Sequence, residues 1–315
     1  MLAATSKALF HTLAGSDALH RLASHYGMAP GSGFARRFIA GETTAEALDV
    51  ARALGARGFR VTLDHLGESV GSVDLAQAAA RAYVELVGQV VDAGVERNLS
   101  LKLTQLGLDV DRATAVDNLR RVLDAAQPHG FFIRIDMENS PYTDVTLDIL
   151  ETVRGLGYTD AGTVIQACLL RSPADVDRLN RLGARVRLVK GAYREPKHVA
   201  YQRMGDVDAA YVALAERLLD AGHSPAFATH DPAIIAAVQQ AAAAHALARD
   251  RFEFQMLYGI RRDLQAALAH EGYRLRVYVP FGKQWFPYFM RRLGERPANV
   301  AFVLRGLWHD RQRGA

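Results

Sequence analysis

The stretch RLRVYVPFGKQWFPYFMRRLGE, residues 274–295, decides the fold because it joins a strand directly to a helix. Its first part alternates β-branched and aromatic residues with others up to a proline and a glycine, which predicts a buried strand over residues 274–282. The helix that follows carries two adjacent arginines, Arg291 and Arg292. Adjacent arginines are ordinary on a solvated helix face, but their planar donor groups also suit a carboxylate or a pyrophosphate.

The same strand–helix order repeats through most of the chain. The expected strands are residues 59–67, 100–107, 131–138, 162–169, 185–193, 225–230, 252–259 and 274–282. The expected helices lie near residues 74–96, 112–127, 143–156, 174–182, 206–221, 232–246, 262–270 and 284–294. These alternating units predict an α/β fold, a closed parallel (βα)8 barrel of the TIM type. An open doubly wound sheet is the alternative, although no strand is followed by a glycine-rich dinucleotide-binding turn.

Residues 1–50 lack this alternation and predict an N-terminal helical arm of two or three short helices. The barrel, which would be the catalytic domain, is expected to occupy residues 51–315 and to end with a further helix over residues 298–308. Helix boundaries carry their own signals. Capping oxygens are expected from Ser72, Ser172 and Asp231, and helix ends at Gly157, Gly183 and Gly222.

Composition narrows the class of protein. The 315 residues are 50% hydrophobic and 23% charged, which is typical of a globular enzyme-sized chain. The net charge of +4 comes from dispersed arginines, so no nucleic-acid partner is expected, although contact with an anionic membrane face remains open. A single cysteine, Cys168, excludes an intrachain disulfide and a multi-cysteine metal site. No secretory signal and no apolar run of about 18 residues is present, so a cytoplasmic location is expected.

Polar side chains gather where the expected strands end, which is where barrel enzymes carry their sites. They are Asp64, His65, Glu68, Lys102, Gln105, Asp136, Glu138, Asn139, Gln166, Lys190, Tyr193, Arg194, Thr229, His230, Asp231, Gln255, Tyr258 and Tyr278. Each has an ordinary structural explanation: Lys102 could pair with Asp136, and residues 229–231 could cap a helix. Buried charge is costly unless it is paired or used, so this many polar positions on one rim favour a site for a polar ligand.

Six motifs, in order along the chain, resemble those of monofunctional bacterial proline dehydrogenases. They are SLKLTQLGLD, FIRIDMENSPYT, RLVKGAYREPK, AFATHDP, RFEFQMLYGI and YVPFGKQWFPYFMRRLGERPANVAFVLRGL, and the resemblance covers residues 59–307. It implies a distorted barrel with the last barrel helix over the carboxyl ends of the strands. It further implies non-covalently bound FAD, oxidation of L-proline to Δ1-pyrroline-5-carboxylate as the first step of proline catabolism to glutamate, and a membrane quinone as electron acceptor.

The resemblance also implies roles for individual residues. Lys102, Arg291 and Arg292 would hold the proline carboxylate, and Glu68 would pair with Arg291 as an acidic gate. Leu188, Tyr193 and Tyr278 would surround the ring. Asp136, Arg187, Tyr278 and Glu68 would form the catalytic group, with Arg187 beside the flavin N5. The FAD contacts would be Met137, Gln166, Arg187, Val189, Lys190, Gly191, Ala192, Tyr193, Thr229, His230, Gln255, Met256, Arg292 and Glu295.

One spacing departs from part of the family. Bifunctional members carry extra residues between the final strand and the two-arginine helix, whereas here Tyr278 and Arg291 are 13 positions apart. The FAD tail is therefore expected to take a different conformation from theirs. Two functions of other classes stay open at this point. One is an aldolase-type lyase in which Lys102 or Lys190 forms a Schiff base, and the other is a barrel that serves only as a binding module.

Overall fold

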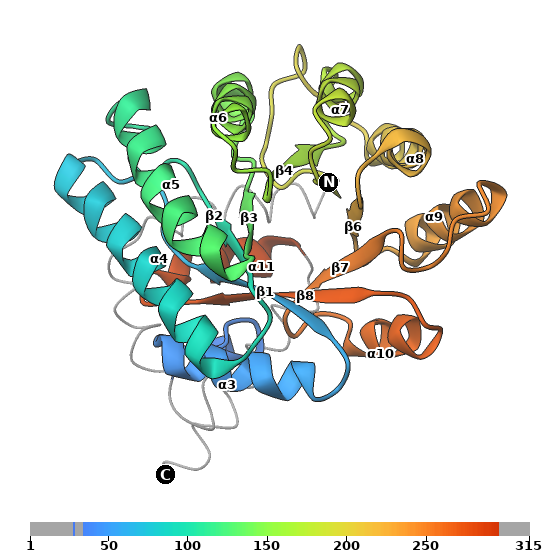
Figure 1. Ribbon diagram of the computed structural model, residues 1–315. Helices are drawn as coiled ribbons and strands as arrows, with labels where there is room; N and C mark the ends of the chain where they lie inside the picture. Colours follow the sequence, from blue (N-terminus) through green and yellow to red (C-terminus); the bar gives the residue numbers. More distant parts are fainter. Residues whose placement is uncertain (1–27, 29–33, 296–315) are drawn as a thin grey trace, which may run out of the picture.

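Eight parallel strands close into one barrel in the computed structural model, which describes Met28 and residues 34–295 (Figure 1). The strands are β1 (Arg60–His65), β2 (Asn98–Leu101), β3 (Phe132–Ile135), β4 (Ala161–Gln166), β5 (Val186–Val189), β6 (Ala226–Ala228), β7 (Glu253–Leu257) and β8 (Leu275–Phe281). Each strand pairs with its sequence neighbour, and β8 closes the barrel on β1. The (βα)8 barrel prediction is confirmed, and the open-sheet alternative is wrong.

A helix follows every strand (Figure 1). All of these helices except the last cover the outside of the barrel. These helices are α4 (Val73–Ala93), α5 (Arg112–Ala126), α6 (Thr143–Gly155), α7 (Ser172–Arg181), α8 (Met204–Ala221), α9 (Pro232–Ala244), α10 (Arg262–His270) and α11 (Trp285–Glu295). Short 3-10 turns, η2 (Gln127–His129) and η3 (Ser140–Tyr142), flank β3. Helix periodicity therefore placed all the barrel helices close to their observed bounds.

Two local predictions need correction. The second strand was expected over residues 100–107, but β2 ends at Leu101, because the following apolar residues fill the core from a turn outside the sheet. Ser172 is the first residue of α7 rather than its cap, since its hydroxyl donates to the Gln166 carbonyl. The predicted helix end at Gly222 is confirmed, since Gly222 caps the C-terminus of α8, with a φ of −80° and a ψ of 154°.

The other caps agree with the sequence. The side chain of Ser72 accepts from the Leu75 N–H at the start of α4, and that of Asp231 accepts from the Ala233 N–H at the start of α9. Gly157 and Gly183 have left-handed φ values of 101° and 65° after their helices, a conformation that favours glycine.

Side chains alternate between the two faces of each strand, and the inner face is polar. The register pairs Ser100 with Arg134 and Gln255 with Arg276, so these side chains share the barrel interior. The outer face packs against the helices and is apolar, as Leu99, Ile133 and Phe227 illustrate. TIM barrels usually fill their interior with branched apolar side chains. The buried charges in this barrel must therefore be paired with one another.

The chain before the barrel contributes a 3-10 turn, η1 (Phe34–Arg37), and α3 (Thr44–Gly55). Buried residues of α3, among them Ala47 and Leu54, belong to the same core as the barrel. The expected domain boundary at residue 50 falls within α3, and the division into an arm and a barrel stays a prediction. The helices expected before residue 28 and over residues 298–308 lie outside the described residues.

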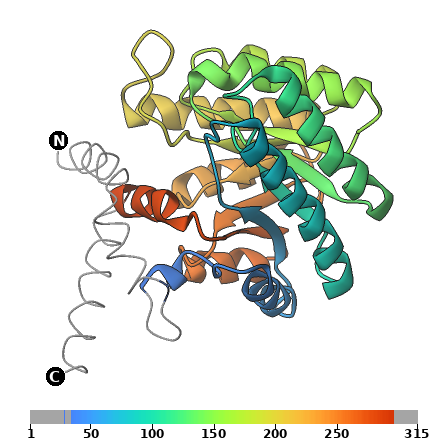
Figure 2. The same cartoon turned by 90° about the vertical axis from the view of Figure 1, so that its left-hand side faces the viewer.

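Helix α11 lies across the carboxyl ends of the strands instead of beside the barrel, as the side view shows (Figure 2). Its buried aromatic residues Trp285, Phe286 and Phe289 form a second apolar cluster with residues near η1. The Trp285 indole also donates to Glu42 at 2.9 Å. This packing turns the opposite side of α11, with Arg291 and Arg292, towards the barrel mouth.

Candidate functional site

A cavity of about 410 Å³ opens at the carboxyl ends of the strands and is bordered by residues of α11. That volume falls within the range of ordinary small-molecule sites. Most of the residues expected in the site line it: Lys102, Asp136, Met137, Gln166, Arg187, Val189, Lys190, Gly191, Ala192, Tyr193, Thr229, His230, Gln255, Met256, Tyr278, Arg291 and Arg292. The fold thus brings together residues from seven strands or strand ends and from α11.

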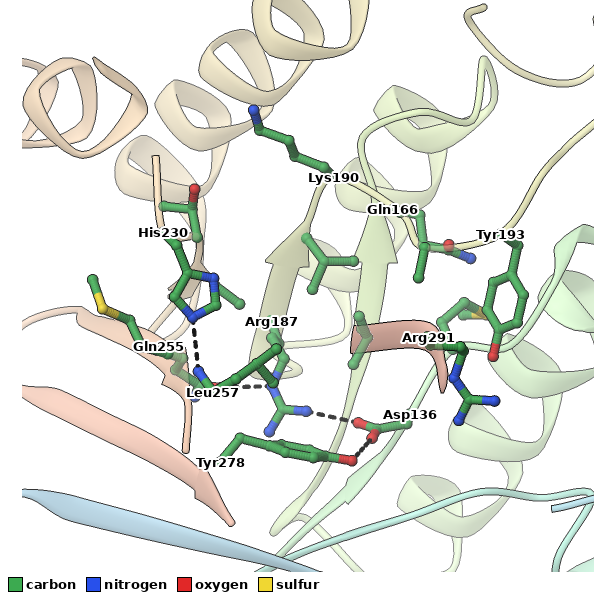
Figure 3. A pocket seen from close by; sticks show the side chains of 18 of the residues that line it. Asp136, Gln166, Arg187, Lys190, Tyr193, His230, Gln255, Leu257, Tyr278 and Arg291 are labelled. Carbon is green, nitrogen blue, oxygen red and sulfur yellow. Dashed lines mark hydrogen bonds and ion pairs between the residues drawn. The ribbon is translucent and has the colours of Figure 1, made fainter. Parts of the chain in front are cut away.

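The floor of the cavity is a hydrogen-bonded set on four strands or strand ends, Asp136, Arg187, Gln255 and Tyr278, which we call the strand group (Figure 3). Arg187 Nη1 donates to one carboxylate oxygen of Asp136 at 2.7 Å, and the Tyr278 hydroxyl donates to the other at 2.9 Å. Arg187 Nε donates to Gln255 Oε1 at 2.6 Å. Asp136 is therefore held by two donors and cannot rotate freely.

This set continues down the barrel axis away from the cavity. Gln255 Nε2 donates to Glu253, which also accepts from Arg276 at 2.8 and 3.0 Å. Arg276 in turn lies 2.9 Å from Glu96 at the opposite end of the barrel. Burial opposes ionisation of Glu253, but Arg276 together with hydrogen bonds lowers its pKa to about 2. The strand group is thus anchored in a buried, charge-balanced interior.

The upper wall of the cavity carries Lys102, Arg291 and Arg292. Together with Glu68, which contacts Arg291 from outside the lining, we call them the rim group. Glu68 and Arg291 form a two-point contact at 2.8 and 3.3 Å, so the expected pairing of these residues is present. Burial lowers the pKa of Arg291, but the Glu68 carboxylate more than restores it. Burial likewise opposes the charge of Lys102, and Asp64, 4.0 Å away, raises its pKa above the ordinary value.

The surroundings of the two lysines of this site bear on the aldolase alternative. A Schiff-base lysine needs a lowered pKa, whereas neighbouring carboxylates raise the pKa of Lys102. The pKa of Lys190 is also raised, against the effect of burial, by its contacts with Asp208 and Asp231 at 2.5 and 2.9 Å. Neither side chain is suited to act as a nucleophile, so the geometry does not favour that reading.

On the side formed by β4 and β5, the cavity is bordered by the chain around Gly191, which packs closely against its neighbours. Gly191 has a φ of 112°, and a Cβ atom on it would lie 2.3 Å from Cys168 Sγ. No other residue fits this position without displacing its neighbours. Gln166 donates to the Glu138 carbonyl at 2.7 Å, and this contact orients the Gln166 side chain next to Gly191. Backbone can therefore approach an extended ligand closely along residues 189–193.

On the side of β6 and β7, His230 and Asp231 line the cavity. Figure 3 shows the contact between His230 and Leu257. The Leu257 N–H donates to His230 Nε2 at 3.0 Å, so this ring nitrogen carries no proton. Thr229 Oγ1 accepts from the Asp231 N–H at 3.1 Å, and Asp231 caps α9. The sequence offered capping as the ordinary reading of residues 229–231, and the structure shows both capping and a place on the cavity wall.

Three expected site residues differ from the others. Leu188 is fully buried in the core and does not line the cavity, because it lies on the opposite strand face from Arg187 and Val189. The structure therefore contradicts its expected place around a ring. Glu68 reaches the site through Arg291 without lining the cavity. Glu295 ends α11, and its side chain lies outside the described part of the structure.

The sequence did not single out several residues that shape this site. Leu257, Met204 and Tyr288 line the cavity, and Glu253 supplies a buried counter-charge. One signal was available for Glu253, since it stands two positions before Gln255 and so faces the same side of the strand. Tyr288 stands three positions before Arg291, which places both on one helix face.

Comparison with known proteins gives a consistent result. The family model described as "Proline dehydrogenase" matches residues 47–305. "Proline dehydrogenase 2" of Bacillus subtilis is 39% identical over 298 residues, which is 95% of this chain and 97% of that protein. "Proline dehydrogenase" of Deinococcus radiodurans is 43% identical over 277 residues, with 87% and 89% of the two chains covered. The chain is therefore similar to these proteins over almost its full length and theirs.

Solved structures agree in fold. Proline utilization A from Bdellovibrio bacteriovorus, inactivated by N-propargylglycine, superposes with a TM-score of 0.78 at 30% identity. The match covers 82% of this chain but only 32% of that much longer protein. Within the described residues, no helix is both long enough and apolar enough to cross a bilayer.

Proposed function

The chain belongs to the proline dehydrogenase family, and from that premise we propose that it oxidises L-proline to Δ1-pyrroline-5-carboxylate with bound FAD. We further propose that the electrons pass to a membrane quinone and that the enzyme works in the cytoplasm, in peripheral contact with the inner face of the cell membrane. One observation supports this proposal more strongly than the others. The cavity places three cations, Lys102, Arg291 and Arg292, opposite the Asp136–Arg187–Tyr278 set, in one space that suits an amino-acid zwitterion beside a redox cofactor.

The residues present fit FAD. Gly191 allows the backbone of residues 189–193 to border an extended ligand, because a side chain there would collide with Cys168. Lys190 and Arg292 offer positive charge to a pyrophosphate, and the side chains of Met137, Gln166, Gln255 and His230 line the rest of that space. When bound, FAD supplies the two-electron oxidation by accepting hydride from the carbon next to the proline nitrogen. Binding is non-covalent in this proposal.

The chain's own residues then have separate tasks. The guanidiniums of Arg291 and Arg292, with the Lys102 ammonium, bind the carboxylate and fix the orientation of the ring. Tyr193 and Tyr278 contribute aromatic surface to the ring's surroundings. Arg187 brings a buried positive charge to the cavity floor, where it favours negative charge that develops on a bound cofactor. Asp136 keeps Arg187 and the Tyr278 hydroxyl in place.

Glu68 closes the site in this proposal. Its carboxylate contacts Arg291 across the cavity rim, and only 16% of the Arg291 side chain is exposed. An ordered Glu68–Arg291 pair narrows the passage through which water enters, and a site with less water strengthens every charged contact within it. Proline can enter only when this contact opens, so substrate binding and closure are linked steps.

The experiment is to purify the protein and record its visible spectrum before and after L-proline is added without oxygen. We expect a flavin spectrum that L-proline bleaches, release of FAD on denaturation, and Δ1-pyrroline-5-carboxylate by mass spectrometry. L-Valine, an acyclic amino acid with the same charges, serves as the control and should leave the spectrum unchanged. A soluble quinone should restore the oxidised spectrum. A colourless protein that cannot be reconstituted with FAD would contradict the proposal.

A further inference from the structure

The loop that carries Glu68 is fastened on both sides of that residue by the turn after β2. Gln105 Nε2 donates to the His65 carbonyl at 3.1 Å, before Glu68. After Glu68, the Ser69 N–H donates to Thr104 Oγ1 at 3.0 Å, and the next N–H, of Val70, donates to the Thr104 carbonyl at 3.2 Å. The position of the Glu68 carboxylate therefore depends on the residues Thr104 and Gln105, which lie close together in the following βα loop.

The loop conformation needs such support. Ser69 adopts a left-handed φ of 54°, which costs free energy for any residue with a Cβ atom. Conformations of this kind persist only where surrounding contacts hold them. The Ser69 contact with Thr104 uses the backbone N–H of the strained residue itself. Loss of the Thr104 hydroxyl would release the point at which the chain turns towards Arg291.

Thr104 is itself rigidly held. Its hydroxyl donates to Glu138 Oε2 at 2.7 Å, and its N–H lies 3.3 Å from Glu138 Oε1. Because a hydroxyl has one proton, and that proton is given to Glu138, its oxygen is left to accept from Ser69. Thr104 is fully buried and Glu138 nearly so. The Glu138 main-chain oxygen is in turn bonded to Gln166, so the anchor extends into the wall of the cavity.

We propose that Thr104 is a positioning residue for Glu68 and thereby for the closed state of the site. Its hydroxyl, oriented by Glu138, sets where the Glu68 loop turns and so sets the approach of Glu68 to Arg291. The same short turn begins with Lys102, which lines the cavity, so the carboxylate-binding cation and the anchor of the gate share one segment. This inference rests on the proposed function, in which the Glu68–Arg291 contact closes over proline.

The test compares Thr104→Val with Thr104→Ser in steady-state proline oxidation and in FAD content. Thr104→Val keeps the shape but removes the hydroxyl, and we expect a KM for proline higher by about 3- to 10-fold, which corresponds to one lost hydrogen bond. FAD content and spectrum should not change. Thr104→Ser keeps the hydroxyl and should stay close to wild type. If Thr104→Val does not fold, Thr104→Ala removes the same hydroxyl without adding a methyl group near the Glu138 carboxylate.

Two control variants separate this effect from general loss of packing. Thr143→Val removes another buried hydroxyl, one that makes no hydrogen bond within the described residues, and should leave KM unchanged. Ser69→Ala keeps the backbone N–H that contacts Thr104 and should also leave KM unchanged. A rise in KM in either control as large as that in Thr104→Val would overturn the proposal.

A second comparison uses Glu68→Ala as the background. Thr104→Val should add nothing in this background, because the residue through which it acts is already absent. An equal further loss would show that Thr104 acts elsewhere, for example through Lys102, and would overturn the proposal. If Glu68→Ala raises KM while Thr104→Val does not, the positioning role fails and the proposed function stands. If Glu68→Ala itself has no effect, the gate of the proposed function fails and this inference fails with it.

Discussion

The strand group and the rim group meet across one cavity but are built differently. The strand group comes from within β5, β7 and β8 and from the residue after β3, and its contacts measure 2.6 to 2.9 Å. The rim group comes from two βα loops and from α11. There the Lys102 ammonium lies 4.0 Å from its counter-ion, Asp64, and the Glu68–Arg291 contact has one arm of 3.3 Å.

This difference indicates a division of tasks. Strands inside a closed barrel are fixed by their neighbours, so the strand group can hold charge in one arrangement, as electrostatic preorganisation requires. Loops and a terminal helix can move, and the rim group brings three cations to the cavity, with Glu68 against Arg291 and Asp64 near Lys102. Cations gathered in this way suit a ligand carboxylate. We infer that the strand group serves the redox step and the rim group serves substrate capture.

The largest effect is expected from the strand group. Arg187→Met leaves Asp136 and Gln255 without their buried donor, so we expect kcat to fall by about 10²- to 10³-fold. The free energy of unfolding should fall by about 3–5 kcal/mol, as for other broken buried ion pairs. Stopped-flow flavin reduction and urea unfolding measure the two effects. Arg217→Met, which breaks an exposed pair with Asp177, is the matched control and should change neither by much.

If Arg187→Met changed KM alone, the division between the two groups would be wrong.

The next effect concerns the pH dependence of stability beneath the strand group. The folded-state pKa of Glu253 is lowered from 4.5 to about 2 by Arg276 and hydrogen bonds, against burial. A depressed pKa contributes stability that is present above about pH 4.5 and is lost as the pH falls towards 2. The shift corresponds to about 3 kcal/mol. The difference in unfolding free energy between wild type and Glu253→Gln should therefore shrink between pH 5 and pH 3, as measured by urea unfolding at each pH.

Glu151→Gln, which alters an exposed contact with Arg178, provides the comparison for that titration. A pH-independent difference for Glu253→Gln would show that the pKa of Glu253 is the same in the folded and unfolded states, so Arg276 would not stabilise its charge in the way described above.

A smaller effect is expected from the two rim arginines. Replacing Arg291 or Arg292 by Met should raise the KM for proline by about 10- to 150-fold, the range that corresponds to losing a charge-assisted contact worth about 1.5–3 kcal/mol. Arg292→Met should also weaken FAD binding, whereas Arg291→Met should not. Steady-state kinetics and FAD titration measure both. Identical behaviour of the two variants would show that Arg291 and Arg292 do not have separate roles, as expected for an ordinary basic helix face.

Most of the fold could be predicted from the sequence, because each strand and helix carries its own periodicity. The end of β2 could not, since Leu103 and Leu106 are as buried as strand residues although they lie in a turn. Burial produces the same apolar pattern in both settings, and only the hydrogen bonds distinguish them. Leu188 shows a second limit: a motif gives the identity of a residue, but the strand face it occupies depends on the register.

The residues that line the candidate site could be predicted better than the buried partners that hold them in place. Motif resemblance placed Asp136, Arg187 and Arg291 in one site, and the structure brings them to one cavity. Their partners were less visible. The sequence did not single out Glu253, and it placed Asp64 among the strand-end residues without indicating its contact with Lys102. Contacts between neighbouring barrel strands have no local sequence signature.

The smallest effect tests whether the rim group moves as a unit. Glu68→Ala should leave FAD binding intact and raise the KM for proline less than Arg291→Met does, because Arg291 has a second role in holding the carboxylate. The two residues share one contact at 2.8 and 3.3 Å. The double variant should therefore lose less than the sum of the two single variants in log kcat/KM, since the shared contact can be lost only once. Strictly additive losses would show that Glu68 and Arg291 do not meet in the substrate complex, and Glu68 would then be an exposed loop acid with no part in closing the site.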